Sequence, residues 1–449
     1  MGSWRAGQLL QHLMLCALAF VLPVRGGESA EAAEAEAGGG DTTAADGAEQ
    51  GQCACGNLKR EHPEDGGRTP RSAGGGGAEG SGEAKPQAVL DAIARHNEQM
   101  VEIGGGRFYM GTPKHLVHFP QDGEGPVRQV KMSSFAIDKY EVSNAKFLEF
   151  VEAEDYVTEA EEFGDSFVAE LWLSPAVSET IDKQVAAVPW WLPVKNCSWR
   201  QPEGFDTDLS GRMDHPVVHV SWNDAAAYCK WRGGALPTEA QWEYASRGGK
   251  DQKNYPWGNA MQPMRPKSDP KGDKIYRMNI WQGKFPTRNT AEDGFNTTAP
   301  VDSYGEQNHF GLYNMVGNVW EWTSDWWTPA HYLTEENQHI GFVDPAGPST
   351  DELDQLKEMG YLEPDAEYEK TKKGGSFMCH KSYCYRYRNC ARTKMTAESS
   401  AHNVGFRCAA EWEDPAGAQP WLDDADLEAA EEEEEGEEGA DDSGRSTSM

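Results

Sequence analysis

The sequence predicts an α+β fold with much irregular structure, organised as a single compact domain. A chain of 449 residues is long enough to bury a sizeable core. Its 16 Trp and 48 Gly favour a loop-rich domain, anchored by aromatic side chains, over a helical bundle. Clear helix patterns are few, and the stretches between them alternate short apolar runs with turn residues.

Three helices are expected, over residues 143–151, 222–231 and 238–246. Near its start, each has a residue of a type that commonly caps helix N-termini. In the third, Thr238 and Gln241 form a capping-box pattern. A strand-turn-strand unit is expected at 101–111, where glycines separate two apolar runs. Residues 326–373 carry many charges without periodicity, which predicts a long surface excursion.

The two ends of the chain differ from its centre in composition. Residues 1–27 contain Arg5, an apolar run and then small residues, which is the layout of a cleaved secretory signal. The apolar run is shorter than the roughly 20 residues of a spanning helix, with an uncleaved anchor as the alternative. Residues 28–96 predict a flexible leader, 97–412 the folded domain, and 413–449 a disordered acidic tail.

Charge and hydropathy limit the classes of partner. The formal net charge is -33, and phosphate binding needs a basic surface, so we expect no nucleic-acid partner. No stretch after the signal approaches membrane length, so we expect no membrane contact. A secreted chain meets conditions in which disulfides persist, and Asn196 and Asn296 each begin an N-glycosylation acceptor pattern.

The densest chemical signal is the run 374–388, which holds Cys379 and Cys384 five positions apart. Fully extended, five residues span about 16 Å, so the chain must turn before the two sulfurs meet. His380 and the cationic side chains of Lys381, Arg386 and Arg388 favour a populated thiolate.

On the residues alone, three interpretations of this pair stay open. Cysteines of secreted proteins usually pair, which favours a structural disulfide. Structural zinc needs four ligands, and only His380 adds one nearby. Two thiolates favour Cu(I) among biological metals, so the third interpretation is a redox or copper site. The usual motifs of hydrolases, nucleotide-binding loops and zinc proteases are absent.

Long irregular segments leave backbone groups that need partners, and bound calcium would meet that need. Two segments offer hard oxygen ligands: Asn279 with Asp293, and Asn314 with Glu321. Local turn or capping roles for the same side chains are equally compatible with the sequence.

Several motifs resemble the formylglycine-generating enzyme family, also called sulfatase-modifying factor 1, over about residues 100–410. They are 190–194 (WWLPV), 236–243 (LPTEAQWE), 311–323 (GLYNMVGNVWEWT), 374–388 and 403–408 (NVGFRC). Most are shared by the wider fold family, including lectin-like and iron-dependent relatives. The pair Cys379 and Cys384 is more specific, because the family's non-catalytic paralogue lacks it.

The resemblance implies a C-type-lectin-like domain in the endoplasmic reticulum lumen. It implies an oxidoreductase that uses Cu(I) and molecular oxygen to convert one cysteine of a newly made sulfatase to Cα-formylglycine. The substrate would be an unfolded polypeptide with a Cys-x-Pro-x-Arg pattern. The alternatives are a non-catalytic paralogue that binds sulfatases or glycans, and an iron-dependent sulfoxide synthase, which wants a histidine cluster that this sequence does not show.

The resemblance also carries site residues onto this chain. The catalytic set is Cys379 and Cys384, as the copper ligands, with Ser376 and Tyr383. The substrate-binding set is Asp165, Ser166, His380, Arg392 and Asn403. Calcium ligands are Asn279, Ile280, Asp293 and Phe295 for one site, and Asn314, Gly317, Val319 and Glu321 for the other, with Glu141 as a structural neighbour.

The remaining cysteines depart in part from the family pattern. Cys229 and Cys408 match one family disulfide, whereas the positions of the second carry Ser246 and Asn389. Cys197 and Cys390 are extra, and we expect them to form a replacement bridge. Cys53 and Cys55 resemble an amino-terminal Cys-x-Cys that the family links to retention through thiol exchange with lumenal partners. Either a monomer or a homodimer fits the sequence.

Overall fold

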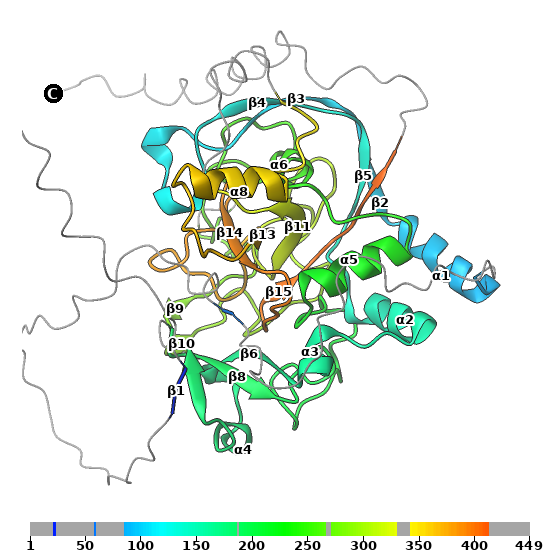
Figure 1. Cartoon of the computed structure of the whole chain (residues 1–449), viewed down its shortest axis with the longest axis vertical. Coiled ribbons are helices and arrows are strands. Elements are labelled where there is room, and N and C mark those ends of the chain that lie inside the picture. The colour runs from blue at the N-terminus through cyan, green and yellow to red at the C-terminus, as the bar shows by residue number, and fades with distance from the viewer. Residues whose placement is uncertain are drawn as a thin grey trace, which may run out of the picture.

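The computed structural model describes residues 21–23, 58–59, 85–185, 188–265, 271–329 and 342–412. Small sheets, short helices and long connections form one body, in agreement with the predicted fold class (Figure 1). Most of the expected signal and leader, with Cys53 and Cys55, and the expected acidic tail at 413–449 lie outside the described residues. Within the described ranges, no helix has the length and apolar character needed to cross a membrane.

The α-helices of the described residues are short, and all except α1 have a side-chain cap at the N-terminus. They are α1 (Gln87–Asn97), α2 (Asn144–Glu154), α3 (Glu159–Phe163), α4 (Pro175–Ser178), α5 (Trp222–Trp231), α6 (Glu239–Arg247) and α8 (Thr350–Glu358). Ser143 caps α2, and Ser221 and Thr238 form capping boxes at α5 and α6. The three expected helices are therefore confirmed, because their start signals are local in sequence.

Within the part of the chain that the structure describes, the strands form six small sheets. They are β1 (Val21–Pro23), β2 (Met100–Ile103), β3 (Gly106–Met110), β4 (Arg128–Met132), β5 (Phe135–Asp138), β6 (Asp165–Ala169), β7 (Lys183–Val185), β8 (Trp191–Lys195), β9 (Gly283–Lys284), β10 (Arg288–Asn289), β11 (Trp320–Trp326), β12 (Phe342–Val343), β13 (Glu369–Lys373), β14 (Arg392–Thr396), β15 (Val404–Gly405) and β16 (Ala409–Glu411). The sheet orders are β14-β13-β11-β15, β12-β4-β3, β16-β5-β2, β6-β8, β1-β7 and β10-β9. The two strands expected at 101–111 exist, but β2 pairs with β5 and β3 with β4.

The expected surface excursion at 326–373 is confirmed over most of 342–368, where the majority of residues are exposed, but its last residues, 369–373, belong to the four-stranded sheet. Its strand β13 is buried along its whole length, between β11 and β14. Lys370 places its ammonium group 4.0 Å from the ring of Trp222 and 3.6 Å from that of Trp326. Lys373 pairs with two carboxylates of α6. Aromatic faces and acidic partners therefore bury lysines that resemble surface residues in the sequence.

The expected disulfide between Cys229 and Cys408 is present, and it ties α5 to the chain just before β16. Beside this end of the chain, Arg407 binds both oxygens of Glu321 at 2.7 Å, and the Trp242 indole donates to the same carboxylate at 2.7 Å. All of these side chains are buried. The end of the folded domain is thus fixed to its centre by covalent and charged contacts.

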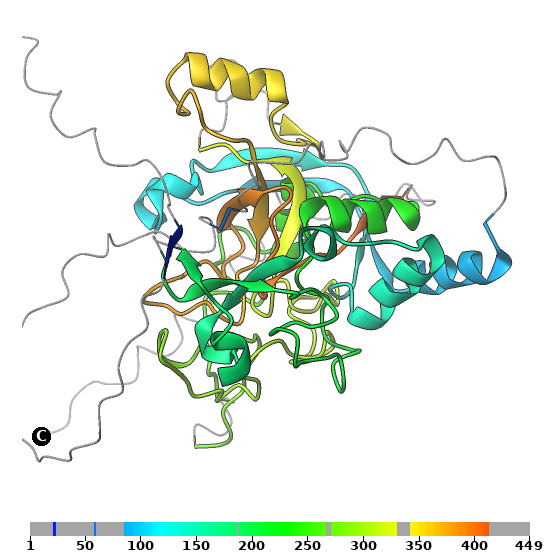
Figure 2. The ribbon, with the colours of Figure 1, turned by 60° about the horizontal axis from the view of Figure 1, so that its bottom comes forward.

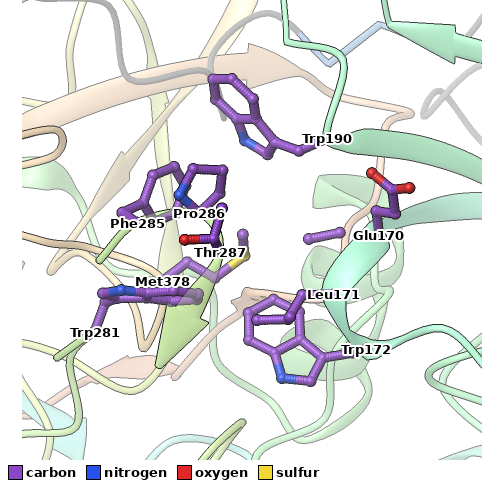
Figure 3. A pocket seen from close by; sticks show the side chains of 10 residues that line it. Glu170, Leu171, Trp172, Trp190, Trp281, Phe285, Pro286, Thr287 and Met378 are labelled. Carbon is purple, nitrogen blue, oxygen red and sulfur yellow. The ribbon is translucent and has the colours of Figure 1, made fainter. Parts of the chain in front are cut away.

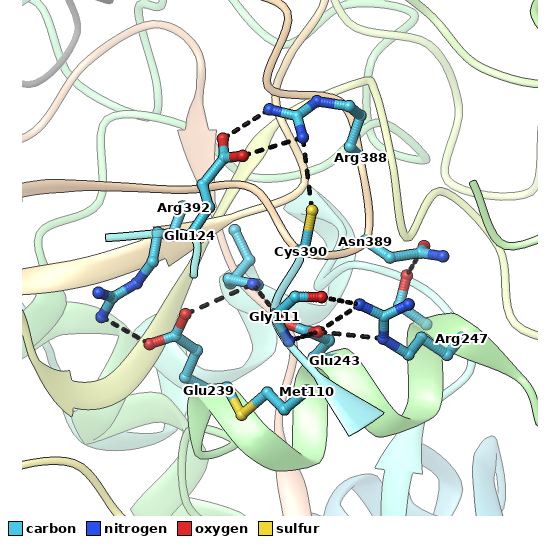
Figure 4. Close-up of polar contacts among 12 residues, drawn as sticks. Met110, Gly111, Glu124, Glu239, Glu243, Arg247, Arg388, Asn389, Cys390 and Arg392 are labelled. Atoms are coloured by element: carbon cyan, nitrogen blue, oxygen red, sulfur yellow. Dashed lines mark hydrogen bonds and ion pairs between the residues drawn. The ribbon is translucent and has the colours of Figure 1, made fainter. Parts of the chain in front are cut away.

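The expected bridge between Cys197 and Cys390 is wrong. Both cysteines are free and buried, in different surroundings. Cys197 belongs to a small apolar cluster, and its sulfur lies 3.6 Å from Nε2 of His219. Cys390 accepts a hydrogen bond at 3.4 Å from Arg388, which is paired with Glu124 (Figure 4). Each thiol is enclosed by its own neighbours. The position of Cys390, one residue after a lost family cysteine, therefore does not bring it to Cys197.

A hydrogen bond occupies the positions of the second family disulfide. The Ser246 hydroxyl donates to the side-chain oxygen of Asn389 at 2.8 Å, and both residues are fully buried. Asn389 also donates to the backbone carbonyl of Lys253. This polar pair links α6 to the segment after the cysteine run without a covalent bond.

The folded part begins before residue 97, where the sequence placed its boundary. Helix α1 lies beside α2 in both overall views (Figure 2), and its His96 is only 3% exposed. The Tyr228 hydroxyl lies 3.1 Å from Nδ1 of His96. Leu58 is also fully buried. Part of the expected leader therefore belongs to the folded domain.

Burial, followed by the positive charges of Lys146 and Arg232, lowers the pKa of His96 to about 4. Arg95 acts in the same direction and Asp138 opposes it, while Glu149 lies 3.4 Å from Nε2. In the unfolded chain His96 titrates near its ordinary value of about 6.5, so stability is expected to fall as the pH drops from about 6.5 towards 4.

Urea unfolding at pH 7 and pH 5 tests this prediction. The variant His96→Gln should lose less stability between the two pH values than the parent chain, because it has no imidazole to protonate. The exposed His115 provides the control variant His115→Gln, which should behave like the parent. An equal loss in the parent and in His96→Gln would show that α1 docking does not depend on a neutral imidazole.

Candidate functional site

The run with the two cysteines begins where β13 ends. Gly374 and Gly375 follow Lys373 with φ angles of 93° and 73°, in the left-handed region that glycine tolerates. A Cβ on Gly374 would lie 2.8 Å from the carbonyl oxygen of Met315, and one on Gly375 would lie 2.9 Å from the amide of Tyr387. Both glycines are therefore needed to turn the chain out of the sheet and into the site.

Cys379 and Cys384 face each other in a buried turn. The backbone amides of Tyr383 and Cys384 donate to the carbonyl of His380 at 3.0 and 2.7 Å, which reverses the chain between the cysteines. The two sulfurs are joined as a disulfide, with the Cα atoms 4.8 Å apart, and the two residues are 1% and 0% exposed. The structure thus brings together the pair that the sequence singled out.

The structure limits two of the earlier expectations for this pair. Among the described residues, no group of three or more His, Cys, Asp and Glu side chains is placed to hold a metal, so structural zinc lacks its ligand set. Arg386 is paired with Asp122, and Arg388 with Glu124. These two cations are neutralised by carboxylates, so they do not favour a thiolate in the way that their position in the sequence suggested.

Ser376 and Asn403 fix the start of the cysteine turn. The side-chain amide of Asn403 donates to the Ser376 hydroxyl oxygen at 3.0 Å. The same oxygen accepts from the amide of Met378, and the Ser376 carbonyl accepts from the amide of Cys379 at 2.8 Å. Both side chains are fully buried. The structure therefore places two of the expected site residues directly against the cysteine segment.

An aromatic cavity of about 310 Å³ lies beside the cysteine segment (Figure 3). It is lined by Ala169, Glu170, Leu171, Trp172, Trp190, Trp281, Phe285, Pro286, Thr287 and Met378. Its walls are apolar apart from Glu170 and Thr287, and Met378 directly precedes Cys379. The amide of Trp281 donates to the carbonyl of Cys379 at 3.0 Å, which fixes the cavity wall to the reactive pair.

Tyr383 joins the cysteine turn to the cavity. Its ring stacks on Phe285, with centroids 4.1 Å apart, and meets the edge of Trp190 at 5.9 Å. Sequence reasoning missed Trp172, Trp281 and Phe285 as site residues, because the segments that carry them are far from 374–388 in the chain. The high Trp content indicated aromatic clusters, but it does not identify which rings pack together.

Ser166 lies in a buried polar cluster behind the cavity. Its hydroxyl lies 2.7 Å from that of Ser400 and 2.8 Å from Nδ1 of His219. The amide of His402 donates to the carbonyl of Phe167, so β6 runs beside the segment that ends at Asn403. Asp165, half-buried, stands at the opposite end of β6 from the cavity residue Ala169.

His402 and Glu203 were also missed by the sequence reasoning. The His402 ring meets the edges of Trp172 at 5.6 Å and of Phe377 at 5.4 Å, and its Nε2 lies 3.2 Å from a carboxylate oxygen of Glu203. Burial alone would raise the pKa of Glu203, but the hydrogen bonds and charges of His402 and Arg212 lower it to about 2. An ionised carboxylate therefore holds the imidazole behind the cavity wall.

The structure does not bring Arg392 and His380 into the cavity. Arg392 is 2% exposed and binds Glu239 at 2.7 Å (Figure 4). It also binds the carbonyl of Thr328 at 2.6 Å and lines a separate cavity of about 250 Å³. Its role in substrate binding stays a prediction. His380 is half-buried, its Nδ1 lies 2.7 Å from the Ser382 hydroxyl, and burial lowers its pKa.

The first expected calcium site has an unused buried oxygen. The side-chain oxygen of Asn279 is buried without a hydrogen-bond partner, while its amide nitrogen donates to Thr297 and Asn318. Asp293 accepts from the amides of Ile280 at 3.0 Å and Phe295 at 3.4 Å. Burial raises the pKa of Asp293 to about 6, since few positive charges lie near it. A hard cation fits these oxygens.

The second expected calcium site shows the same feature. The side-chain oxygen of Asn314 is buried without a partner, and its nitrogen donates to Glu141 at 2.9 Å. Burial and the charge of Glu321 raise the pKa of Glu141 to about 8. Glu321 itself is occupied by Arg407 and Trp242. A cation fits the Asn314 oxygen, because it would offset the repulsion between the Glu141 and Glu321 carboxylates. Glu141, expected only as a structural neighbour, therefore lies close enough to contribute to this site.

Both expected glycosylation acceptors lie on exposed positions. Asn196 follows β8 with a φ of 58°, and Asn296 lies in the loop after Asp293. Each side chain is exposed, so an enzyme could reach it in the folded protein.

Comparisons with known proteins agree with this geometry. Residues 86–412 match the family model described as "Sulfatase-modifying factor enzyme 1-like domain". The chain is 48% identical over 365 residues to "Formylglycine-generating enzyme" from Bos taurus, covering 80% of this chain and 86% of that protein. It is 48% identical over 312 residues to the protein of the same name from Thermomonospora curvata, covering 70% and 93%.

Two further matches have lower sequence identity. "Inactive C-alpha-formylglycine-generating enzyme 2" from Bos taurus is 40% identical over 310 residues, covering 69% of this chain and 87% of that protein. A solved structure of PvdO from Pseudomonas aeruginosa aligns at a TM-score of 0.44 and 23% identity, covering 70% and 94%. The family match extends over most of the chain and includes every site residue described above. The chain therefore belongs to the sulfatase-modifying factor enzyme 1-like family, together with the formylglycine-generating enzymes.

Proposed function

We propose that this chain converts a cysteine of newly made sulfatases to Cα-formylglycine. Its similarity to proteins named formylglycine-generating enzyme supports an enzyme that modifies a cysteine in another protein. The single observation that carries the proposal is the paired Cys379 and Cys384, buried next to an aromatic cavity. A thiol substrate held in that cavity would lie beside Met378, the residue that directly precedes Cys379 in the cysteine turn.

The proposed reaction balances with oxygen and a thiol reductant. The substrate CH2–SH group becomes an aldehyde, and its sulfur leaves as hydrogen sulfide. Oxygen gives one atom to the aldehyde and the other to water. Two electrons come from the substrate carbon and two, with two protons, from the thiol reductant. The reductant also opens the disulfide between Cys379 and Cys384, which frees both thiols for the reaction.

The donor set of the reduced pair fits Cu(I), because two buried thiolates provide soft, low-coordination ligands. Bound by Cys379 and Cys384, copper would supply the one-electron chemistry that oxygen requires. Ser376 and Asn403 hold the turn that presents the two sulfurs. Tyr383, Phe285 and the Trp residues exclude water from the cavity and pack against the substrate.

An assay with peptide substrates tests this proposal. The purified chain is incubated with Cu(I), oxygen, a thiol reductant and a Cys-x-Pro-x-Arg peptide, and mass spectrometry detects the aldehyde. A matched peptide with serine in place of cysteine is the control and should remain unchanged. If copper binds and no aldehyde forms, the chain is instead a binding protein, like the alternative non-catalytic paralogue.

We also propose that calcium occupies the two sites at Asn279 and Asn314, on the strength of their unpartnered oxygens. Removing calcium with a chelator is expected to lower Tm by about 5 °C or more, because the ion binds only the folded state. Differential scanning calorimetry measures this shift, and re-addition of calcium should reverse it. The variants Asn279→Ala and Asn314→Ala should each reduce the shift. A Tm that changes neither with the chelator nor with added calcium would contradict the proposal.

The same function suggests the lumen of the endoplasmic reticulum as the compartment. The disulfide between Cys229 and Cys408 and the exposed Asn196 and Asn296 support this location. We further propose unfolded sulfatase polypeptides as the main partners.

A further inference from the structure

We propose that the outer edge of β7 receives the substrate polypeptide as an added strand and directs the residues before that strand into the aromatic cavity. The inference rests on the proposed function, because it names how the substrate of that site is held. It concerns Lys183–Val185 and the backbone of the substrate. No side chain of the substrate beyond its cysteine is required for the pairing itself.

The structure already contains an extended segment on this edge. Strand β1 pairs antiparallel with β7, with Val21 opposite Val185 and Pro23 opposite Lys183 (Figure 1). Among the described strands, β7 has no other partner in its sheet. Strand pairing uses backbone groups, so an edge that accepts one extended segment accepts others of different sequence. Residues 21–23 fall in the expected signal, whose removal would take β1 away from this edge.

The edge of β7 leads to the cavity. Asp182 and Lys195 lie 4.0 Å apart, which places the start of β7 beside the end of β8. At its other end, the amide of Val188 donates to Val185, and that of Trp191 donates to Val188. These two bonds place Val188 beside the end of β7, and Trp190, a wall of the cavity, follows Val188 closely in the chain.

The pairing of β6 with β8 shows which end of β7 lies nearer the cavity. In the pairing of β6 with β8, Ala169 lies opposite Trp191, and Asp165 opposite Lys195. Ala169 and the residues up to Trp172 line the cavity. The cavity therefore lies at the Val185 end of β7.

The direction of the added strand follows from this arrangement. Because the pairing is antiparallel, the residue opposite Val185 comes first in the added strand and the residue opposite Lys183 comes later. Residues that precede the strand are the ones nearest the cavity. In a Cys-x-Pro-x-Arg substrate, the cysteine would enter the cavity and the residues after it would lie along β7. An unfolded, extended substrate meets this geometry, whereas a folded one does not.

Backbone methylation of a substrate peptide tests the inference without relying on catalysis. The probe is a fluorescent sulfatase peptide with serine in place of cysteine, in which single N-methyl groups replace successive N–H groups after that serine. Binding is measured by fluorescence polarisation. Successive N–H groups in a strand point to opposite sides, so every second position should weaken binding by about 3- to 10-fold. The positions between them should stay within about 2-fold, apart from the proline.

Two chain variants give an independent measurement. Lys183→Pro and Gln184→Pro are neighbours whose N–H groups point to opposite edges of β7. One of them should weaken binding of the unmethylated serine peptide and the other should not. Circular dichroism and Tm confirm that each variant is folded. If a variant does not fold, the test rests on the N-methylated peptides, which require no change in the chain.

The outcomes separate this inference from the proposed function. If the cysteine peptide gives the aldehyde but methylation shows no alternation, the β7 inference is overturned and the proposed function stands. If alternation is seen without aldehyde formation, the β7 edge is a peptide-binding site and the proposed chemistry fails. Binding that is lost at all methylated positions alike would also overturn strand pairing.

Discussion

Replacing Cys384 with serine is expected to lower the rate of aldehyde formation by more than about 1,000-fold. The substitution removes one of the two buried sulfurs that define the site, and a hydroxyl is a poor ligand for a soft metal. The assay is aldehyde formation by mass spectrometry at saturating peptide. Copper binding, measured by competition with a Cu(I) chelator, should be lost in parallel.

The stability of the same variant separates chemistry from folding. In the presence of a reductant neither the parent nor Cys384→Ser has a bond between positions 379 and 384, so their free energies of unfolding should agree within about 1 kcal/mol. Ser382→Ala, at an exposed position in the same turn, is the matched control and should keep activity. If Cys384→Ser keeps activity close to that of the parent, the pair is a structural disulfide.

Removing the disulfide between Cys229 and Cys408 is expected to cost about 5 kcal/mol of unfolding free energy. The bond closes a loop with a sequence separation of 179 residues, and the chain-entropy model assigns more stabilisation to longer loops. The double variant Cys229→Ser/Cys408→Ser, studied by urea denaturation without a reductant, measures this cost. At temperatures where it remains folded, its activity should be close to that of the parent.

The control for this experiment is a cysteine outside both pairs. Cys197 is equally buried and free, so Cys197→Ser should change stability by only about 1 to 2 kcal/mol, through packing alone. Equal losses in the two variants would mean that the disulfide contributes no more than an ordinary buried side chain. Loss of the pair Cys229 and Cys408 is thus expected to lower stability, whereas loss of the pair Cys379 and Cys384 is expected to lower the rate of aldehyde formation.

Features that are local in sequence were predicted well. The α2, α5 and α6 helices follow from caps such as Ser143 and Thr238, which act within one turn. The cysteine turn was recognised because both thiols lie in one short run. The disulfide between Cys229 and Cys408 was found only through family resemblance, since spacing alone does not define a partner.

Features that depend on distant partners were not predictable from pattern. Strand β13 looked like a surface segment because its lysines find Trp222, Trp326 and the acids of α6 only in the folded state. The cavity combines the end of β6 and the residues after it, Trp190 just before β8, residues between 281 and 287, and Met378. The bridge expected between Cys197 and Cys390 failed for the same reason, because sequence gives no distance between two separate clusters.

The last strand of the domain has a consequence for its synthesis. β16 pairs with β5, and the segment just before it supplies Asn403, Arg407 and Cys408. Contacts between the earliest and latest parts of a domain form slowly, and a ribosome delivers this segment after all other parts of the domain. The site is therefore incomplete on any nascent chain that ends before Asn403, and the disulfide that closes the domain cannot form until Cys408 has been added.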